Sequence, residues 1–257
     1  MEQEYRQALA SLPISSIRYF QKVGSTNDEA LQWASEGAPD LSLVIAEEQT
    51  KGRGRAGRKW FTPPGASLAF SLILRPAATD AFSPSLLTGL GALALVDALE
   101  ARGLAPQIKW PNDVLLDRKK TAGILVEANW IGEKMESAVI GVGVNVKPES
   151  VPPPEQVSFP AVCVETEIGH AVDRPILLRD ILASLLAWRG KMGGREVVGN
   201  WEQSLAFMNE IVQVWTGSES PVAGRVLGLE SDGSLRLQVH DKTVTVQFGE
   251  VHLRPGL

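Results

Sequence analysis

The segment from residue 50 to residue 65, TKGRGRAGRKWFTPPG, concentrates positive charge in an acidic protein. Its basic residues fall within nine positions that contain no acidic residue: Lys51, Arg53, Arg55, Arg58 and Lys59. Glycines at 52, 54 and 57 alternate with them, and glycine lets a backbone approach a ligand and aim N–H groups at it. An arginine guanidinium can form two parallel hydrogen bonds with phosphate or carboxylate oxygens. The spacing predicts an anion-receiving loop; a solvated basic loop that contacts nothing is the alternative.

The letters G-R-G-R-A-G match the dinucleotide-binding fingerprint G-x-G-x-x-G, but the context does not. That fingerprint needs a helix to open after the glycines, and here the double proline of RKWFTPPG prevents one. The sequence also lacks the G-K-[ST] of a P-loop and the H-R-D and D-F-G motifs of protein kinases. Any nucleotide chemistry must therefore use another scaffold.

A second group of reactive side chains lies in IKWPNDVLL, residues 108–116, where Pro111 fixes a turn. Lys109, Asn112 and Asp113 surround it, and Lys120 follows just before Ala122, Gly123 and an apolar strand-like run. An ammonium group at the mouth of a sheet can stabilise developing negative charge. The alternatives are a plain turn and a solvated lysine that flanks a strand.

Composition limits the other possibilities. The chain has 257 residues, 25 basic against 30 acidic residues and a net charge of −5, so any phosphate recognition must be local. The three histidines are scattered and Cys163 is the single cysteine, which argues against a histidine-based zinc site, an internal disulfide and a cysteine cluster. One cysteine also suits a reducing compartment.

The surrounding pattern interleaves helices with strands. Polar caps and helical spacing predict helices over 25–37, 84–102, 176–188 and 197–207. Short β-branched or alternating runs predict strands over 42–49, 67–76, 120–130 and 138–146. The proline-rich run 147–160 is expected to be an exposed, rigid loop.

From about Asn209 the helical pattern gives way to short alternating strands separated by turns, which predicts a small all-β barrel. We therefore expect a catalytic domain over 1–208 and a C-terminal domain over 209–257. The N-terminus shows no signal peptide, and the longest apolar stretch, 86–101, is interrupted and shorter than the roughly 20 residues that span a bilayer. A cytoplasmic protein without membrane contact is the expectation.

Five motifs stand in the order found in biotin protein ligases, a family that the sequence strongly resembles: GSTNDEA, EEQTKGRGRAGRKWFTPPGASLAFSLIL, IKWPNDVLL, KKTAGILVE and IGVGVNV. The resemblance runs from about residue 17 to the C-terminal FGEVHLR. It implies an α+β fold with a class II synthetase-like mixed sheet flanked by helices, and a C-terminal SH3-like β-barrel.

The resemblance also implies the activity. Such enzymes adenylate biotin with ATP and Mg2+ to give biotinyl-5′-AMP and pyrophosphate, and then transfer biotin to one lysine of a biotin carboxyl carrier protein. Many carry an N-terminal DNA-binding domain, but only about twenty residues precede the STN motif here. The expectation is a short form without a DNA partner.

Matching positions assign roles by resemblance. The implied catalytic residues are Lys120, Arg53, Arg55 and Asp113. Those implied to bind biotin are Ser25, Thr26, Asn27, Gln49, Gly52, Arg53, Lys120, Gly123 and Leu125. Those implied to bind ATP are Arg53, Arg55, Trp60, Lys109, Asn112, Asn145 and Arg254. We also expect the basic loop to be mobile when empty, because its positive charges repel one another.

Several assignments stay open at this point. Asp113 could hold magnesium through water or help to deprotonate the acceptor lysine, and no other protein-borne metal ligand is expected. Thr26 and Asn27 could serve simply as helix caps, and Arg254 could be an exposed terminal arginine. Family members often pair through the central sheet, so a homodimer through residues 139–146 is possible.

Two other functions compete. Lipoate ligases share the fold and the adenylation chemistry but lack the GRGRxGRxW loop. An RNA-binding module would use the basic loop and the β-barrel without catalysis, and the acidic net charge and the absence of an aromatic stacking motif argue against it.

Overall fold

The computed structural model describes residues 1–76, 83–216, 221–247 and 251–255, with the backbone alone at 216 and 251–255. Its helices are α1 Glu2–Ala8, α2 Thr26–Ser35, α3 Pro84–Glu100, α4 Val164–Ile168, α5 Arg174–Arg189 and α6 Arg195–Gln203. The strands of the first sheet are β1 Ser16–Phe20, β2 Ser42–Ala46, β3 Ser67–Leu74, β4 Gln107–Lys109, β5 Asp113–Leu116, β6 Lys119–Ile131 and β7 Lys134–Asn145. Those of the second are β8 Ile211–Thr216, β9 Val222–Leu229, β10 Leu235–Val239, β11 Lys242–Val246 and β12 Val251–Pro255.

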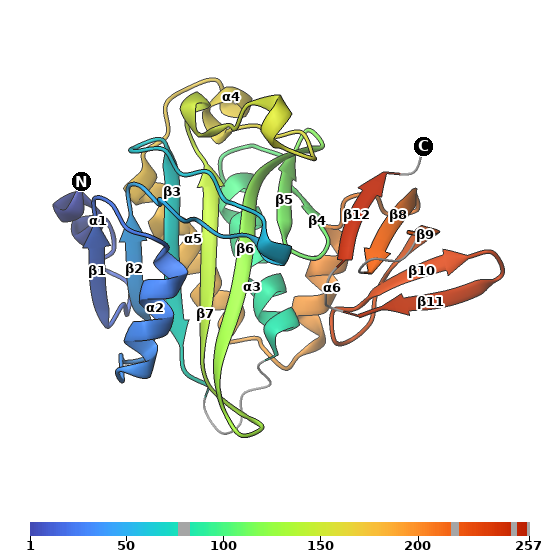
Figure 1. The fold of residues 1–257 in the computed structure, drawn as a ribbon, viewed down its shortest axis with the longest axis horizontal. Helices are drawn as coiled ribbons and strands as arrows, with labels where there is room; N and C mark the ends of the chain where they lie inside the picture. Colours follow the sequence, from blue (N-terminus) through green and yellow to red (C-terminus); the bar gives the residue numbers. More distant parts are fainter. Residues whose placement is uncertain (77–82, 217–220, 248–250, 256–257) are drawn as a thin grey trace.

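The larger sheet is mixed and has seven strands in the order β1-β2-β3-β7-β6-β5-β4. β1 and β2 run parallel, with Ser16 opposite Ser42, and every other neighbouring pair is antiparallel. The long β6–β7 hairpin forms its centre (Figure 1). This architecture confirms the predicted α+β fold with a mixed sheet flanked by helices.

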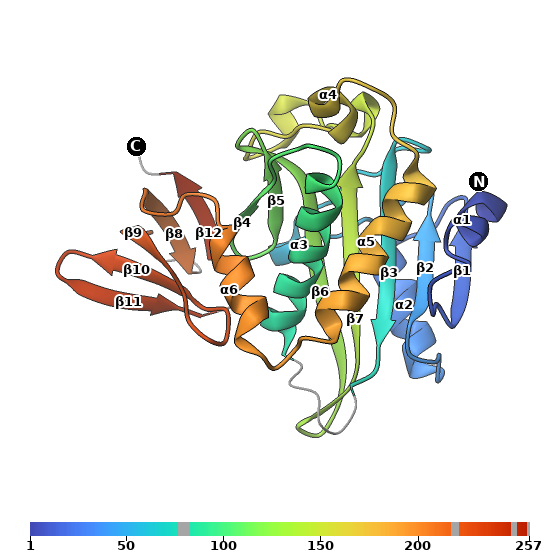
Figure 2. The same ribbon diagram turned by 180° about the vertical axis from the view of Figure 1, so that it is seen from behind.

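Helices cover both faces of this sheet. α2 packs on one face, against β2, β3, β6 and β7 (Figure 1), and α3 packs on the other against β4 to β7 with α5 beside it (Figure 2). All eight positions of β3 are buried, as a strand covered on both faces requires. The larger sheet, covered by helices on both faces, is therefore a fixed base for the loops that connect its strands.

α3 is apolar on nearly every side because it lies between the sheet and the outer helices. Its start follows from local chemistry: the Ser83 hydroxyl accepts a hydrogen bond from the Leu86 N–H at 3.2 Å, and Pro84 occupies the first turn. Gly89 is required in the middle, since a Cβ there would overlap the indole ring of Trp201. No helix of the described residues is long and apolar enough to cross a membrane.

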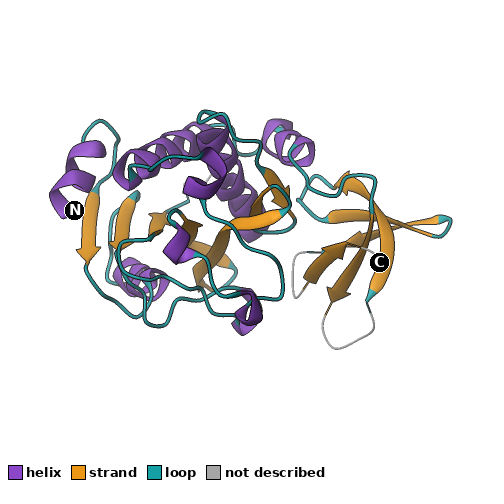
Figure 3. Cartoon of the chain, turned by 90° about the horizontal axis from the view of Figure 1, so that it is seen from above, coloured by secondary structure: helices purple, strands orange, loops and turns teal. Residues whose placement is uncertain are grey.

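The C-terminal strands form a five-stranded antiparallel sheet, β11-β10-β9-β8-β12, beside the larger sheet (Figure 3). The Trp110 indole N–H donates to the carbonyl of Gly233 at 2.8 Å, which joins the two parts. Arg118 binds both carboxylate oxygens of Glu210, at 2.8 and 2.9 Å. The expected boundary near Asn209 falls in the short connection between α6 and β8, where Asn209 adopts a positive φ, and it stays a prediction.

Candidate functional site

The basic loop, residues 50–60 and hereafter the Gly-Arg loop, is folded back on itself. The carbonyl of Gly52 accepts a hydrogen bond from the Trp60 N–H at 2.9 Å, and the Gly54 N–H donates to the Arg58 carbonyl at 2.7 Å. A Cβ on Gly52 would lie 2.5 Å from the Trp60 carbonyl oxygen, so this close approach requires glycine. Ala56, at the tip, has a φ of 52°. The loop is thus a narrow hairpin that presents its arginines.

Arg53 is held by two carboxylates from different elements. Its Nη1 and Nη2 donate to Glu127 at 2.9 and 2.8 Å, and Nη2 also donates to Asp28 at 2.5 Å. Hydrogen bonding to Glu127, with the charges of both acids, raises the pKa of Arg53. The guanidinium is therefore attached to β6 and to the first turn of α2.

Arg55 lies in a different environment. Burial, together with the neighbouring Arg58, lowers the pKa of Arg55, and the charge of Asp113 acts in the opposite direction. Asp113 faces Gly123 across β5 and β6, whereas Glu127 lies four residues further along β6, about 13 Å away at ~3.3 Å per residue. The two arginines, which are only two positions apart in sequence, thus have different surroundings: Arg53 binds carboxylates of α2 and β6, whereas Arg55 is partly buried beside Arg58 and within the field of Asp113.

Two ammonium groups converge on Asp113. Lys109 Nζ lies 3.0 Å from Oδ2 and Lys120 Nζ lies 2.6 Å from Oδ1. The side chains of Lys109 and Asp113 are 5% and 3% exposed, while that of Lys120 is 23% exposed. The region along β6 from Lys120 to Glu127, which faces Trp60 and the start of α2, is hereafter called the slot. Burial alone would raise the pKa of Asp113, but the two lysines outweigh it and hold that pKa well below its ordinary value.

The backbone around this cluster is fixed from two sides. The N–H of Lys120 donates to the carbonyl of Pro160 at 2.7 Å, and its carbonyl accepts from the Val162 N–H at 3.0 Å. The Asn112 amide donates to the Ile124 carbonyl at 2.8 Å. The proline-rich run predicted as an exposed loop therefore has a positioning contact at its end.

Trp60 packs against the sheet at the Lys120 end of the slot. A Cβ on Gly143 would overlap its indole ring, and one on Gly123 would lie 3.3 Å from it, so both glycines make room for this ring. Lys120 Nζ lies 5.2 Å from the ring centroid. The Trp60 indole N–H is buried and has no hydrogen-bond partner among the described residues. A buried donor of this kind is costly unless a ligand supplies an acceptor.

Uncharged polar side chains lie at the other end of the slot, away from Lys120. The N–H and Oγ1 of Thr26 both bond to Gln49 Oε1, at 2.8 and 3.1 Å, and Gln49 Nε2 donates to Thr62 at 3.1 Å. The Ser71 hydroxyl lies 2.8 Å from Thr26 Oγ1 and 2.6 Å from Asn27 Oδ1. Ser25, also buried, is the N-cap of α2 but forms no side-chain cap bond, so capping does not explain its hydroxyl.

The structure brings the predicted residues into two groups. One contains Arg55, Trp60, Lys109, Asn112, Asp113, Lys120 and Gly123. The other contains Thr26, Asn27, Gln49, Arg53 and the carbonyl of Leu125. Asn145, at the end of β7, donates instead to the carbonyl of Val162 at 3.3 Å. Arg254 lies in β12, and its side chain is outside the described residues.

Sequence reasoning missed three members of the second group: Asp28, Ser71 and Glu127. Gly123, Leu125 and Glu127 alternate along β6 and so share one face of the strand, and this alternation could have identified Glu127. Asp28 lies in the acidic first turn of α2, where a carboxylate is favoured by the helix dipole alone.

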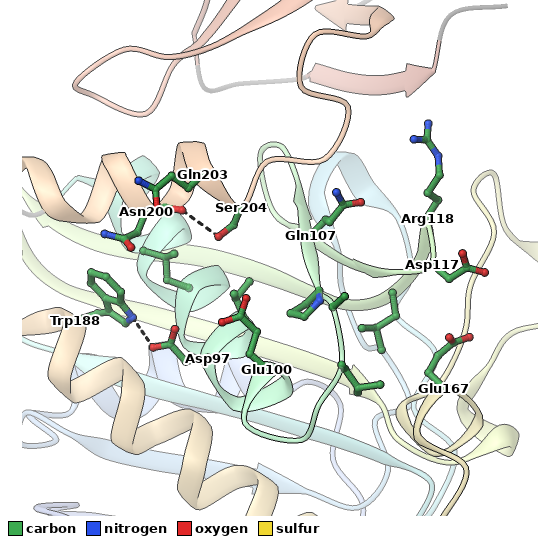
Figure 4. A pocket seen from close by; sticks show the side chains of 16 residues that line it. Asp97, Glu100, Gln107, Asp117, Arg118, Glu167, Trp188, Asn200, Gln203 and Ser204 are labelled. Carbon is green, nitrogen blue, oxygen red and sulfur yellow. Dashed lines mark hydrogen bonds between the residues drawn. The ribbon is translucent and has the colours of Figure 1, made fainter.

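A cavity of about 780 Å³ lies away from this site, near the C-terminal end of α3 (Figure 4). Asp97, Glu100, Trp188 and Asn200 are among its lining residues, and the Trp188 N–H donates to Asp97 at 2.8 Å. No predicted site residue whose side chain the structure describes lines it.

Comparison with known proteins agrees with this geometry. Residues 19–145 match the model of the Biotin/lipoate A/B protein ligase family. The chain is 38% identical to the biotin–[acetyl-CoA-carboxylase] ligase of Paracoccus denitrificans, over 84% of this chain and 92% of that protein. It is 32% identical to the bifunctional ligase/repressor BirA of Bacillus spizizenii, over 91% of this chain and 73% of that protein.

A solved structure has the same fold. The biotin protein ligase from Aquifex aeolicus in complex with biotin and ATP superposes with a TM-score of 0.82 at 26% identity, covering 94% of this chain and all of that one. The sequence motifs, the arrangement of the site and these likenesses agree. The chain belongs to the biotin protein ligases, within the biotin/lipoate A/B protein ligase family.

Proposed function

We propose that this protein adenylates biotin with ATP, releasing pyrophosphate, and then transfers the biotinyl group to a lysine of a biotin carboxyl carrier domain. The observation that carries the proposal is the pairing of two features in one slot. Lys109 and Lys120 converge at one end, and the uncharged pair of Thr26 and Gln49 forms the other.

The first half-reaction matches the charged end. A carboxylate oxygen of biotin forms a bond to the α-phosphorus of ATP, and the bond from that phosphorus to the bridging oxygen breaks as pyrophosphate leaves. The acid is already ionised at pH 7, so the obstacle is bringing anions together. Lys120 is exposed enough to reach them, while Arg55 and Lys109 add fixed positive charge nearby.

The uncharged end matches the ureido ring of biotin, which donates and accepts hydrogen bonds without carrying charge. Ser25, Thr26 and Gln49 offer both kinds of group, with Asn27 beside them. We assign the apolar tail of biotin to the floor between these residues and Lys120, above Gly123. Gly52 and Leu125 complete this slot.

For the nucleotide, we assign the adenine to Trp60, whose ring packs against Gly123 and Gly143 and whose buried indole N–H has no partner among the described residues. Asn112 and Lys109 are assigned to the phosphate region, and Asn145 and Arg254 to the base. Mg2+ would be carried by the ATP phosphates, because the described residues contain no cluster of three potential metal ligands and both oxygens of Asp113 already face ammonium groups. Its contribution when bound is to neutralise phosphate charge.

In the second half-reaction the acceptor amine attacks the biotinyl carbonyl carbon, AMP leaves, and one proton is lost. The pKa of Asp113 is held well below its ordinary value, so it is a weak base for an ammonium with a pKa near 10.4. We therefore favour an electrostatic role, in which Asp113 fixes Lys109 and Lys120 in place. If Asp113 instead deprotonated the acceptor lysine, Asp113→Asn would transfer the biotinyl group slowly from preformed biotinyl-5′-AMP.

We also propose a homodimer, formed through β6 and not through β7. β7 is paired along Ala138–Asn145 with β3 and β6 and has no free edge there. Beyond Ile124 no described strand pairs with the outer edge of β6, which ends in the exposed Trp130 and Ile131. Ala128→Pro should remove an outward N–H and favour monomers in light scattering; a wild type that stays monomeric with its substrates bound would contradict the proposal.

The test of the function uses a carboxyl carrier domain as acceptor. With biotin and Mg-ATP, mass spectrometry should find one added biotinyl group on one lysine of the carrier, and lipoate should give no product. Lys120→Met should abolish transfer, whereas the matched Lys119→Met, at a half-exposed neighbour whose ammonium pairs with exposed Asp117, should not. Addition of lipoate in place of biotin would identify a lipoate ligase instead.

A further inference from the structure

The Gly-Arg loop carries charges that repel one another, yet Arg53 does not face the other arginines. Its guanidinium makes three hydrogen bonds to two carboxylates, those of Glu127 on β6 and Asp28 on α2. Both Nη atoms are engaged, and the fork onto Glu127 is bidentate, the strongest geometry for an arginine–carboxylate pair. Arg53 is thus bound to two other elements of the protein, β6 and α2.

The same carboxylate is connected to the uncharged end of the slot. Asn27 Nδ2 donates to Glu127 Oε2 at 2.9 Å and to the Leu125 carbonyl at 3.1 Å. Asn27 Oδ1 in turn lies 2.6 Å from the Ser71 hydroxyl. A Cβ on Gly141 would overlap the Asn27 amide, so glycine at this position of β7 allows the amide to lie flat on the sheet.

This chain of contacts continues to the residues that we assign to biotin. Ser71 bonds to Thr26, and Thr26 bonds to Gln49, at the base of the Gly-Arg loop. The loop is therefore fastened to one platform twice, at its base by Gln49 and near its tip by Arg53. Any ligand that orders Thr26 and Asn27 also orders the partner of Arg53.

We propose that Glu127, with Asp28, is a positioning residue that anchors the Gly-Arg loop over the slot through Arg53, and that Asn27 couples this anchor to biotin. The inference rests on the proposed function for the identity of the ligand. Arg53 holds the loop in place, and Arg55, the arginine near Asp113, serves the reacting groups.

The loop supplies its own assay, because trypsin cleaves after lysine and arginine and five such residues lie between 51 and 59. We would compare Glu127→Gln and Asp28→Asn with wild type by the rate of cleavage within the loop, without substrates and then with biotin. The matched control is Glu133→Gln, the same substitution at an exposed glutamate in the turn of the same hairpin. Thermal melting of each variant confirms that it is folded.

Loss of the anchor should speed cleavage by about five-fold in Glu127→Gln, the factor expected for a partly exposed ion pair. Glu133→Gln should match wild type. In pyrophosphate exchange, KM for biotin should rise by a similar factor with kcat nearly unchanged, because saturating ligand closes the loop again. A variant with a general packing defect would instead show a lower melting temperature, without a raised KM for biotin at nearly unchanged kcat.

A double-mutant cycle gives the decisive comparison. In an Arg53→Ala background, where trypsin retains four sites in the loop, Glu127→Gln should have no further effect on cleavage. The proposal would be overturned if Glu127→Gln changed the cleavage rate by the same factor with arginine and with alanine at position 53, or if it changed the rate in neither background. A wild type that shows no exchange with biotin would remove the proposed function, while the cleavage experiment without substrates would still test the anchor.

Discussion

Asp113→Asn removes the negative charge from a cluster in which two ammonium groups share one buried carboxylate. Lys109 is the side chain most affected, since it is 5% exposed and packs with its ammonium 4.8 Å from the centroid of the Phe159 ring. Lys120 is 23% exposed and can turn to water. Breaking a buried pair by removing one partner costs about 3–5 kcal/mol. Because only one of the two lysines is fully buried, we expect the free energy of unfolding to fall by about 3 kcal/mol, near the lower end of this range.

Urea unfolding at pH 7 measures this loss as a change in the free energy of unfolding. The matched control is Asp117→Asn, because Asp117 pairs with Lys119 at 3.0 Å but its side chain is 72% exposed. Its positive φ of 45° suits asparagine as well as aspartate. The control should change stability by less than about 0.5 kcal/mol.

The pH dependence follows from the lowered pKa of Asp113. A carboxyl whose folded-state pKa is depressed stabilises the protein above its unfolded value and loses that stabilisation as pH falls through the folded pKa. The difference between wild type and Asp113→Asn should therefore be full at pH 7 and shrink below the ordinary value of 3.8. A loss under about 1 kcal/mol at pH 7, or one that does not shrink in acid, would refute this account of the cluster.

Two further predictions concern the scaffold. Gly89→Ala should destabilise the protein by about 1–3 kcal/mol because its Cβ overlaps Trp201, whereas Gly199→Ala, in open space on α6, should stabilise it by up to about 1 kcal/mol; urea unfolding of both variants measures the contrast. Arg174→Met should cost about 3–5 kcal/mol because Glu47, 6% exposed and 2.8 Å away, would lose the cation that neutralises its buried charge, and a loss below about 1 kcal/mol would contradict that.

Long, periodic elements were predictable from the sequence. The runs that predict strands over 67–76 and 138–146 correspond to β3 and β7, and helical spacing placed α3 to within two residues of its end. α1 was not predicted, since its seven residues are mostly charged or polar and only Tyr5 is buried. Isolated helices this short have little stability of their own, so tertiary packing decides whether they form.

The components of the site could be predicted, but not all of their partners. Lys109, Asp113 and Lys120 stand close in sequence, and the β5–β6 pairing brings them together. The carboxylates that bind Arg53 lie 25 and 74 positions away, and only the packing of α2 on β6 reveals them. Charge repulsion within a loop is visible in a sequence, whereas the distant acids that neutralise it are not.

The proposed function depends on the activation of biotin beside Lys109 and Lys120. We would measure the biotin-dependent exchange of labelled pyrophosphate into ATP in the presence of Mg2+, without any acceptor protein. We expect exchange that requires biotin, ignores lipoate and is lost in Lys120→Met but kept in Lys119→Met. No exchange with biotin, or exchange supported equally by lipoate, would contradict it.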